Sequence, residues 1–415
     1  MMFAMRTAMF TGVLAAAGLA ALSRTAAASP TLTPITNRDY AIDMWSSIPF
    51  GDSAALGMGG ANVARAYGSS GALDNPAAPS IRRSTDNDTW GIDYHLDYLN
   101  GSLSSDYNNA GIDYPALGIV QPDTHSQQLT IGGALRVYNW GIALSATARS
   151  MLINGAAAQP GGGTSELYAE TLLFKGSLAH FFEGPDIAIG IAAQAAVFNM
   201  QTDCAGPECG NLFTVGGWGA QVGATWLPHL QSFRVAGVLS TGITGSDVTG
   251  GSCTDPTHCD GFILPEKVVT PATATAGIAY RFAPTPWNQQ TPTPFRDEMS
   301  LTLAFDAVTT APVDNAYGID AFGIGYLERS DAHYTVSPRA GFEWEMIPGR
   351  FRLRGGSYFE PSRFDGVDGR VHGTFGLELR VFEVDVWGLR RGRITLTGDF
   401  ARDYSNLGID IGLWH

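Results

Sequence analysis

Four cysteines are the residues of this 415-residue chain whose spacing most directly indicates a covalent chemistry. They form two close pairs, Cys204 with Cys209 and Cys253 with Cys259, and each pair flanks a turn-rich insert between strand-like segments. In an exported chain such pairs predict disulfides within each loop. The alternative is a zinc site near His258, but neither pair has the usual C-x2-C spacing and an oxidising compartment disfavours free thiolates. Pairing between the two loops stays open.

A second set of residues alternates charged and aliphatic side chains. Its charged members are Arg352, Arg354, Glu378, Arg380 and Asp410. Alternate residues of a β-strand share one face, so these charges are expected on one side and the aliphatic residues on the other. A membrane barrel with lipid outside and a polar lumen explains this pattern better than a soluble sandwich does. We interpret the five charges as structural ion pairs of the lumen rather than as catalytic groups.

No catalytic or cofactor-binding motif accompanies these residues. The Gly57-x-Gly59 sequence lacks the third glycine and the βαβ context of a dinucleotide-binding fingerprint, and G-x-S-x-G, H-E-x-x-H and P-loop sequences are missing from the chain. The eight histidines are scattered. We therefore predict a protein that is not an enzyme and uses no cofactor or metal. A lipid hydrolase whose Ser and His are brought together by barrel closure is the alternative.

The stretch 54–80 is the segment around which the rest of the chain is organised. It is small, Gly-rich and nearly uncharged, with Arg65 and Asp74 as its only ionisable groups. Its key positions are Gly57, Gly59, Gly60 and the Asn75-Pro76-Ala77 sequence. Glycines allow close approach between backbones and prolines exclude an ordinary helix interior, so the stretch cannot form a core alone. We predict a hatch or plug that packs inside a larger β structure.

The elements that must enclose this segment are strands. Alternating segments from Thr89 to Trp414 give fourteen to sixteen strands, depending on whether the weak segments 110–120 and 316–327 are counted. Short turns at 138–139 and 183–186 contrast with long polar segments at the opposite strand ends, an asymmetry typical of outer-membrane barrels. We predict an all-β fold, a transmembrane antiparallel β-barrel of about 14 strands with the N-terminal hatch in its lumen.

Composition and processing signals agree with this architecture. Only 15% of residues are charged and 51 are Gly, and outside the N-terminus no run approaches the ~18 apolar residues of a spanning helix. Residues 1–28 have the features of a signal peptide that ends in Ala26-Ala27-Ala28. We therefore divide the chain into a signal peptide (1–28), a hatch (29–87) and a barrel (88–415). The net charge of −14 argues against nucleic-acid binding and fits solvated acidic loops, with divalent-cation binding as the alternative.

Several segments, in matching order, resemble one protein family. The sequence ALGMGGA from Ala55 to Ala61, followed by Asn75-Pro76-Ala77, is similar to the hatch region of the long-chain fatty-acid outer-membrane transporters (FadL) and their PorV-type relatives. The segments GIAYRF (277–282), RLRGGSYFEP (352–361) and ARDYSN (401–406) resemble later strands of the same superfamily. The resemblance implies a fourteen-stranded barrel with a hatch that contains Asn75, Pro76 and Ala77.

The resemblance also implies passive uptake of hydrophobic compounds, such as long-chain fatty acids or aromatic hydrocarbons, through the outer membrane of a diderm bacterium. The expected partners are outer-membrane lipid, lipopolysaccharide and a hydrophobic small molecule. The alternative is a PorV-like scaffold or shuttle that binds a secreted protein and transports no solute. A general aqueous porin is disfavoured because the hatch would block its pore.

Overall fold

The structure is a computed structural model that describes residues 32–44, 52–111, 113–114, 119–120, 123–156, 165–203, 210–291, 296–330, 333–364, 366–385 and 389–413. The predicted signal peptide, Cys204 and Cys209 lie outside the described residues. Within the described ranges, no helix combines the length and the apolar character needed to cross a membrane.

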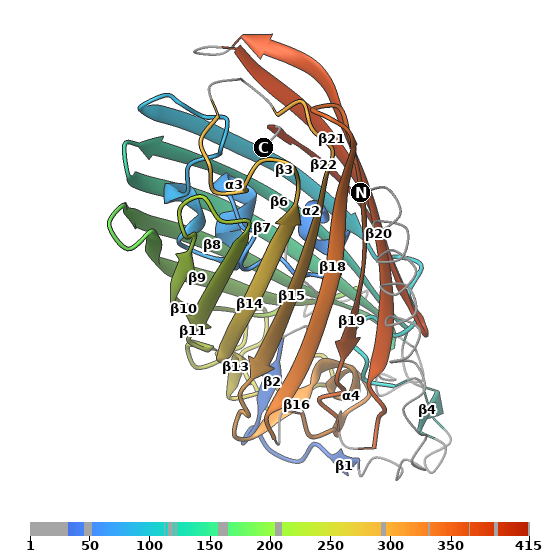
Figure 1. Ribbon diagram of the computed structural model, residues 1–415. Coiled ribbons are helices and arrows are strands. Elements are labelled where there is room, and N and C mark those ends of the chain that lie inside the picture. The colour runs from blue at the N-terminus through green and yellow to red at the C-terminus, as the bar shows by residue number, and fades with distance from the viewer. Residues whose placement is uncertain are drawn as a thin grey trace.

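The chain folds into a closed antiparallel barrel of 14 strands (Figure 1). The wall strands are β3 (Trp90–Asn100), β6 (Asp123–Val137), β7 (Trp140–Ala156), β8 (Ser165–Phe182), β9 (Ile187–Asp203), β10 (Asn211–Trp226), β11 (Phe233–Ser240), β14 (Thr273–Phe282), β15 (Ser300–Thr310), β18 (Thr335–Ile347), β19 (Phe351–Glu360), β20 (Arg370–Asp385), β21 (Leu389–Ala401) and β22 (Tyr404–Leu413). Pairing of β22 with β3 closes the barrel and leaves no free edge along the paired wall.

Side chains alternate strictly between the two faces of this wall. On β15 the outward residues Leu303 and Phe305 are exposed, whereas Ala304 and Asp306 between them face inward and are buried. The outward face also carries aromatic residues where strands begin or end, including Trp90, Trp140, Phe182, Trp226 and Phe282. An apolar outer face bordered by aromatic residues is the pattern that a surrounding hydrocarbon layer favours.

The two ends of the barrel differ in their connections. Two-residue and four-residue turns join β6 to β7 and β8 to β9, as predicted, and we call this end the short-turn end. The opposite end, which we call the loop end, carries the long connections from β11 to β14 and from β15 to β18. The weak segments 110–120 and 316–327 fall in loop-end connections rather than in the wall, which is why the barrel has 14 strands and not 16.

The loop-end connections contain small elements of their own. They are β4 (Asp113–Tyr114), β5 (Ile119–Val120), β12 (Ile243–Gly245), β13 (Lys267–Thr270), β16 (Ala316–Gly318), α4 (Ile319–Gly323) and β17 (Tyr326–Leu327). The N-terminal strands β1 (Thr33–Pro34) and β2 (Ala41–Asp43) join them: β1 pairs with β17, and β2 pairs in parallel with both β13 and β16. The start of the described chain is therefore part of the loop end.

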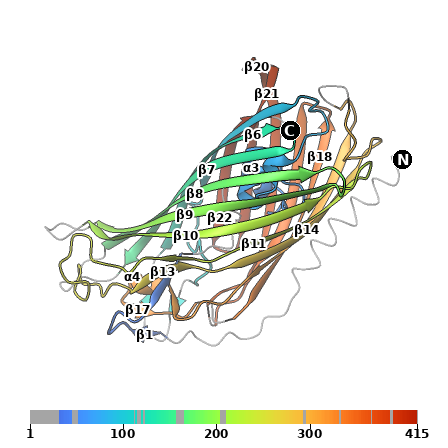
Figure 2. The same ribbon diagram turned by 90° about the vertical axis from the view of Figure 1, so that its left-hand side faces the viewer.

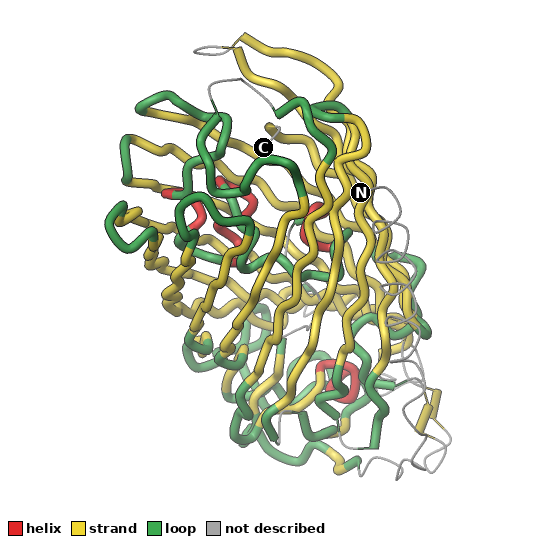
Figure 3. Tube along the Cα trace, viewed as in Figure 1, coloured by secondary structure: helices red, strands yellow, loops and turns green. Residues whose placement is uncertain are grey.

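Residues 52–83, called here the N-terminal segment, lie nearer the short-turn end. They contain α2 (Ser53–Leu56), α3 (Gly68–Asp74) and the 3-10 turn η2 (Ala78–Ser80), which appear as short red stretches framed by strands in Figure 3. Helix α2 contacts β20, β21 and β22, α3 contacts β3, β6 and β7, and η2 contacts β6 to β9. Contacts with so much of the circumference place the segment against the inner wall, and Figure 2 shows α3 surrounded by strands.

Candidate functional site

The N-terminal segment begins with a capped helical turn. The Asp52 carboxylate accepts a hydrogen bond from Ala54 N (2.8 Å) and so caps α2, which is too short to be stable without packing. The helix ends at Gly57, where a Cβ would lie 3.1 Å from Gly376 Cα of β20. Glycine on both sides therefore lets the two backbones touch.

The next turn needs glycine for its backbone conformation as well as for space. Gly59 and Gly60 have positive φ angles of 65° and 71°, and a Cβ on Gly59 would lie 2.7 Å from Ser357 N of β19. The wall contributes glycine in return, since a Cβ on Gly341 of β18 would lie 2.1 Å from Met58 O. Larger residues on either side would push the segment off the wall.

The Asn-Pro-Ala turn is held by the side chain of Asn75, which is fully buried. Its Oδ1 accepts from Ala77 N (2.9 Å) and forms an Asx turn, while its Nδ2 donates to Thr225 Oγ1 of β10 (2.8 Å). A Cβ on Gly190 of β9 would lie 2.1 Å from Pro76 O, so this turn also rests on wall glycine. Asn75 thus shapes the turn and attaches it to the barrel.

Three buried aspartates of the wall accept hydrogen bonds from backbone N–H groups of the segment, and we call them the wall carboxylates. The bonds run from Ser53 N to Asp97 Oδ2 (2.7 Å), from Ser69 N to Asp93 Oδ2 (2.6 Å), and from Asn62 N and Val63 N to Asp306 Oδ2 (2.7 and 2.8 Å). The segment is therefore fixed at three separate points on β3 and β15.

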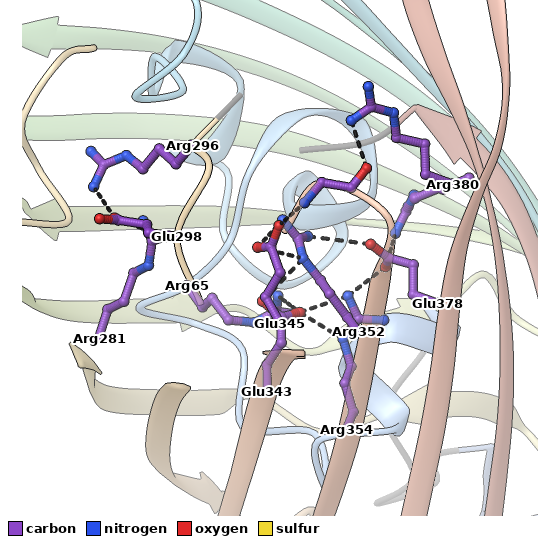
Figure 4. A network of polar contacts seen from close by, with 12 residues as sticks. Arg65, Arg281, Arg296, Glu298, Glu343, Glu345, Arg352, Arg354, Glu378 and Arg380 are labelled. Carbon is purple, nitrogen blue, oxygen red and sulfur yellow. Dashed lines mark hydrogen bonds and ion pairs between the residues drawn. The ribbon is translucent and has the colours of Figure 1, made fainter. Parts of the chain in front are cut away.

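An ion-pair network across β18, β19, β20 and β21 contains three of the predicted lumen charges (Figure 4). Its pairs are Arg352–Glu345 (3.1 Å), Arg352–Glu378 (3.2 Å), Arg354–Glu343 (2.6 Å), Arg354–Glu378 and Arg393–Glu378 (3.3 Å). Arg65 of the N-terminal segment joins it through Glu343 (3.1 Å). Burial strips these charges of water, so each depends on its partners to remain ionised.

The other two predicted lumen charges lie at the margins of this network. Asp410 of β22 is buried and pairs with Arg393 (3.1 Å), which links β22 to the network. Arg380 is half-buried at the short-turn end and donates through Nη1 to Gly349 O (2.6 Å) in the turn between β18 and β19. Arg380 therefore attaches β20 to the turn between β18 and β19.

Asp74 and Arg65 are the two charged residues of the 54–80 stretch, and burial shifts the pKa of both. Burial raises the pKa of Asp74 to about 6, although the hydrogen bond from Asn62 Nδ2 (2.6 Å) opposes the shift. Burial also lowers the pKa of Arg65, against the attraction of Glu343. Within the described residues, no group of three or more His, Cys, Asp or Glu side chains is arranged to hold a metal ion.

The loop end of the interior is filled by an apolar cluster, called here the loop-end cluster. Inward residues of β7 to β10 supply its wall side: Met151, Ile153, Leu167, Phe198, Met200 and Phe213. The loop-end connections, together with β2 and the residue before it, supply its cap side: Tyr40, Ile42, Phe262, Leu264, Ile319 and Phe322. Cys253 and Cys259 form a disulfide within this cap, with their Cα atoms 5.4 Å apart. The cluster resembles a domain core rather than an open polar pore.

The sequence analysis did not single out three buried residues of the inner wall, Asp93, Asp97 and His372. Asp93 and Asp97 share the inner face of β3, and their spacing of four with period two was the available signal. His372 of β20 was also missed. Its two ring nitrogens lie 2.9 Å from Asp399 Oδ1 and from Glu360 Oε2, so the ring bridges two buried carboxyl groups.

No protein-family model matches the chain, and no curated protein matches its sequence. Solved structures do match its fold. A FadL homologue from Pseudomonas aeruginosa has a TM-score of 0.52 at 12% identity, covering 87% of this chain and 97% of the other. The Ralstonia pickettii toluene transporter TbuX has a TM-score of 0.50 at 12% identity over 88% and 98%, respectively. The Pseudomonas putida toluene transporter TodX has 0.51 at 12% over 91% and 99%. The chain thus shares the barrel fold of FadL-type transporters.

Proposed function

We propose that this protein is an outer-membrane channel for passive uptake of hydrophobic compounds, and that the N-terminal segment is its hatch. One observation carries the proposal: the interior holds an apolar cluster at the loop end and a small-residue segment at the short-turn end. A hydrophobic solute gains about 25 cal/mol per Å² of apolar surface when it leaves water for such a cluster. The solved structures of toluene transporters with the same fold support this proposal.

The proposed direction of passage follows from the placement of the two regions. The loop end faces outward in our proposal, and a solute enters by displacing apolar cap contacts in the loop-end cluster. The hatch blocks the route toward the short-turn end until its hydrogen bonds to the wall carboxylates break. Both fatty acids and neutral aromatic hydrocarbons fit the apolar entry region, so the substrate test should include one of each.

A reversible covalent lock tests the hatch directly. A Cβ on Gly408 of β22 would lie 2.6 Å from Ser53 Oγ, so the two positions face each other. The same Cβ would lie 2.5 Å from Leu99 Cδ2 and 2.6 Å from Thr397 Cγ2, and these two side-chain ends must move aside to admit a disulfide between Ser53→Cys and Gly408→Cys. Uptake of labelled toluene and of a labelled long-chain fatty acid should be measured in proteoliposomes. We expect the oxidised double variant to lose uptake and the reduced one to recover it, with each single variant as control. Undiminished uptake by the oxidised protein would contradict the hatch.

The scaffold alternative has one observation in its favour, which is that the loop-end cluster is fully packed from wall to cap. A PorV-like barrel would keep this cluster closed and bind a secreted protein through its loops. Absence of uptake for both labelled solutes, together with specific retention of one secreted protein from the native culture medium, would favour that function over transport.

A further inference from the structure

One connection at the short-turn end is much longer than the turns beside it. Residues 283–299 join β14 to β15, whereas two and four residues suffice between β6 and β7 and between β8 and β9. Its described parts, residues 283–291 and 296–299, are called here the strap, and Figure 1 shows them in gold at the same end as α3. Hairpins of neighbouring strands need only two to five linking residues, so the extra length serves something other than closing this hairpin.

The strap is held in one shape by two of its own charged residues. Arg296 is buried and donates through Nη1 to Pro286 O (2.9 Å) and through Nη2 to Trp287 O (3.2 Å). It also pairs with Glu298 (3.4 Å; Figure 4). Glu298 Oε2 in turn accepts from Thr285 N (3.1 Å) and Thr285 Oγ1 (2.9 Å). A loop with these internal bonds presents its remaining side chains at defined positions.

Hydrogen bonds attach the strap to two other parts of the chain. Asn288 Nδ2 donates to Phe233 O at the start of β11 (3.1 Å). Thr291 N donates to Ser84 O (2.7 Å), and Asn87 Nδ2 donates to Thr291 O (2.8 Å), where the chain leaves the N-terminal segment and approaches β3. The strap therefore connects β11 with the exit of the N-terminal segment.

Between these attachments the strap reaches the N-terminal segment itself. Trp287 is 5% exposed and belongs to an apolar cluster that contains Met58 and Val63 of the segment. Arg234 of β11 lies between two aromatic rings: its guanidinium carbon is 4.0 Å from the ring centroid of Trp287 and 4.8 Å from that of Tyr67. A buried guanidinium is attracted to the face of each ring. Arg234 thus joins the strap to the segment.

We propose that Arg234 and Trp287 are positioning residues that hold the N-terminal segment in the barrel, and that the strap must lift before the segment can move. The inference rests on the proposed function, in which this segment is the hatch. The wall carboxylates hold the segment from the wall, and the strap holds it from the short-turn end. Asn288 Oδ1 accepts from Arg234 Nε (2.8 Å) and so fixes the guanidinium between the two rings.

Hydrogen exchange followed by mass spectrometry on the full chain in detergent tests this role. Trp287→Leu keeps an apolar side chain but removes the ring, so exchange of residues 58–70 should become about tenfold faster. Trp287→Phe keeps an aromatic face for Arg234 and should stay within about threefold of the native rate. Trp218→Leu, on the outward face of β10, is the matched control and should exchange as the native protein does. Peptides from β7 to β9 should exchange alike in every variant.

Two outcomes would overturn the inference. Unchanged exchange of residues 58–70 in Trp287→Leu would show that the strap does not hold the segment. Equal acceleration in the segment and in β7 to β9 would make Trp287 a residue that stabilises the whole barrel instead. Asn288→Ala gives an independent test that leaves Trp287 in place, and it should speed exchange of the same residues about fivefold.

Uptake of a labelled long-chain fatty acid and of labelled toluene in proteoliposomes separates this inference from the proposed function. Trp287→Leu should take up at least one of the two solutes faster than Trp218→Leu does. Faster exchange of residues 58–70 without faster uptake would support the strap as the element that holds the segment, and would contradict the segment's role as a hatch.

Discussion

At the loop end, Phe198 and its neighbours meet the cap mainly through apolar side chains. At the short-turn end the N-terminal segment also makes apolar contacts, such as those of Val63 in the cluster with Trp287, but hydrogen bonds and ion pairs to the wall are added to them. Apolar contacts have no preferred direction, so a cluster of this kind can rearrange around an apolar guest of suitable size. Hydrogen bonds to fixed carboxylates are directional and define one position. The loop end is therefore the more adaptable of the two, and the N-terminal segment is held in one position at the other end.

The glycine pattern sharpens this contrast. At the short-turn end, wall glycines such as Gly190 and Gly341 would clash with the N-terminal segment if they carried a Cβ. The wall side of the loop-end cluster instead consists of large side chains such as Phe198 and Phe213. The short-turn end thus fits backbone against backbone, and the loop end fits side chain against side chain. If a solute passes as proposed, it requires side-chain movement at the loop end and displacement of a whole segment at the other.

The largest expected effect is a loss of stability when the ion-pair network around Glu378 is broken. Glu378→Ala removes the common partner of Arg352, Arg354 and Arg393 and leaves buried positive charge without compensation. The free energy of unfolding should fall by about 3–5 kcal/mol. Urea unfolding in detergent, followed by tryptophan fluorescence, measures this change. Glu378→Gln keeps the shape of the side chain and should cost less. Equal stability of the native protein and Glu378→Ala would mean that the network contributes nothing to this end.

The loop-end cluster should respond to truncation in a different way. Phe198→Ala should lower the free energy of unfolding by about 3 kcal/mol because Phe198 is fully buried. The same variant should bind toluene more tightly, since an apolar cavity accepts an apolar guest. Equilibrium binding of labelled toluene measures the second effect. Phe305→Ala, on the outward face, is the control and should change neither stability to this extent nor toluene binding. A destabilised Phe198→Ala with unchanged binding would contradict the proposed entry region.

A smaller effect is expected when one contact between the N-terminal segment and a wall carboxylate is removed. Asp306→Ala takes away the acceptor of Asn62 N and Val63 N and leaves two buried donors without this partner. The loss, about 1.5 kcal/mol, should speed hydrogen exchange of the 58–66 region about tenfold. Exchange followed by mass spectrometry reports this region separately from the wall strands. Asp247→Asn in an exposed loop should leave exchange unchanged, and equal protection in both variants would exclude Asp306 as a hatch contact.

The barrel was predictable from local patterns, because a wall with an apolar outside and a polar inside imposes period two on every strand. The turns at 138–139 and 183–186 were predicted correctly for this reason. Short segments carry too few residues for periodicity to separate wall from connection, so 110–120 and 316–327 left the strand number open. The partners of Asp93 and Asp306, and the parallel pairing of β2 with β13 and β16, are contacts between distant parts of the chain. No local pattern encodes them.

The smallest expected effect concerns the charge of Asp74 on the N-terminal segment. Burial raises its pKa to about 6 from an ordinary value of 3.8, so the folded state holds this proton more tightly than the unfolded chain does. The free energy of unfolding should therefore fall as pH rises from about 4 to about 6 and then level off. Asp74→Asn stays neutral and should flatten this part of the profile. Between pH 4 and pH 6, the Tm of the native protein should fall by about 2 °C more than the Tm of Asp74→Asn. Thermal unfolding at pH 4, 5, 6 and 7 measures it. Parallel profiles for the native protein and Asp74→Asn would show that this carboxyl is solvated. The part of the N-terminal segment around Asp74 would then be exposed to water instead of packed against the wall.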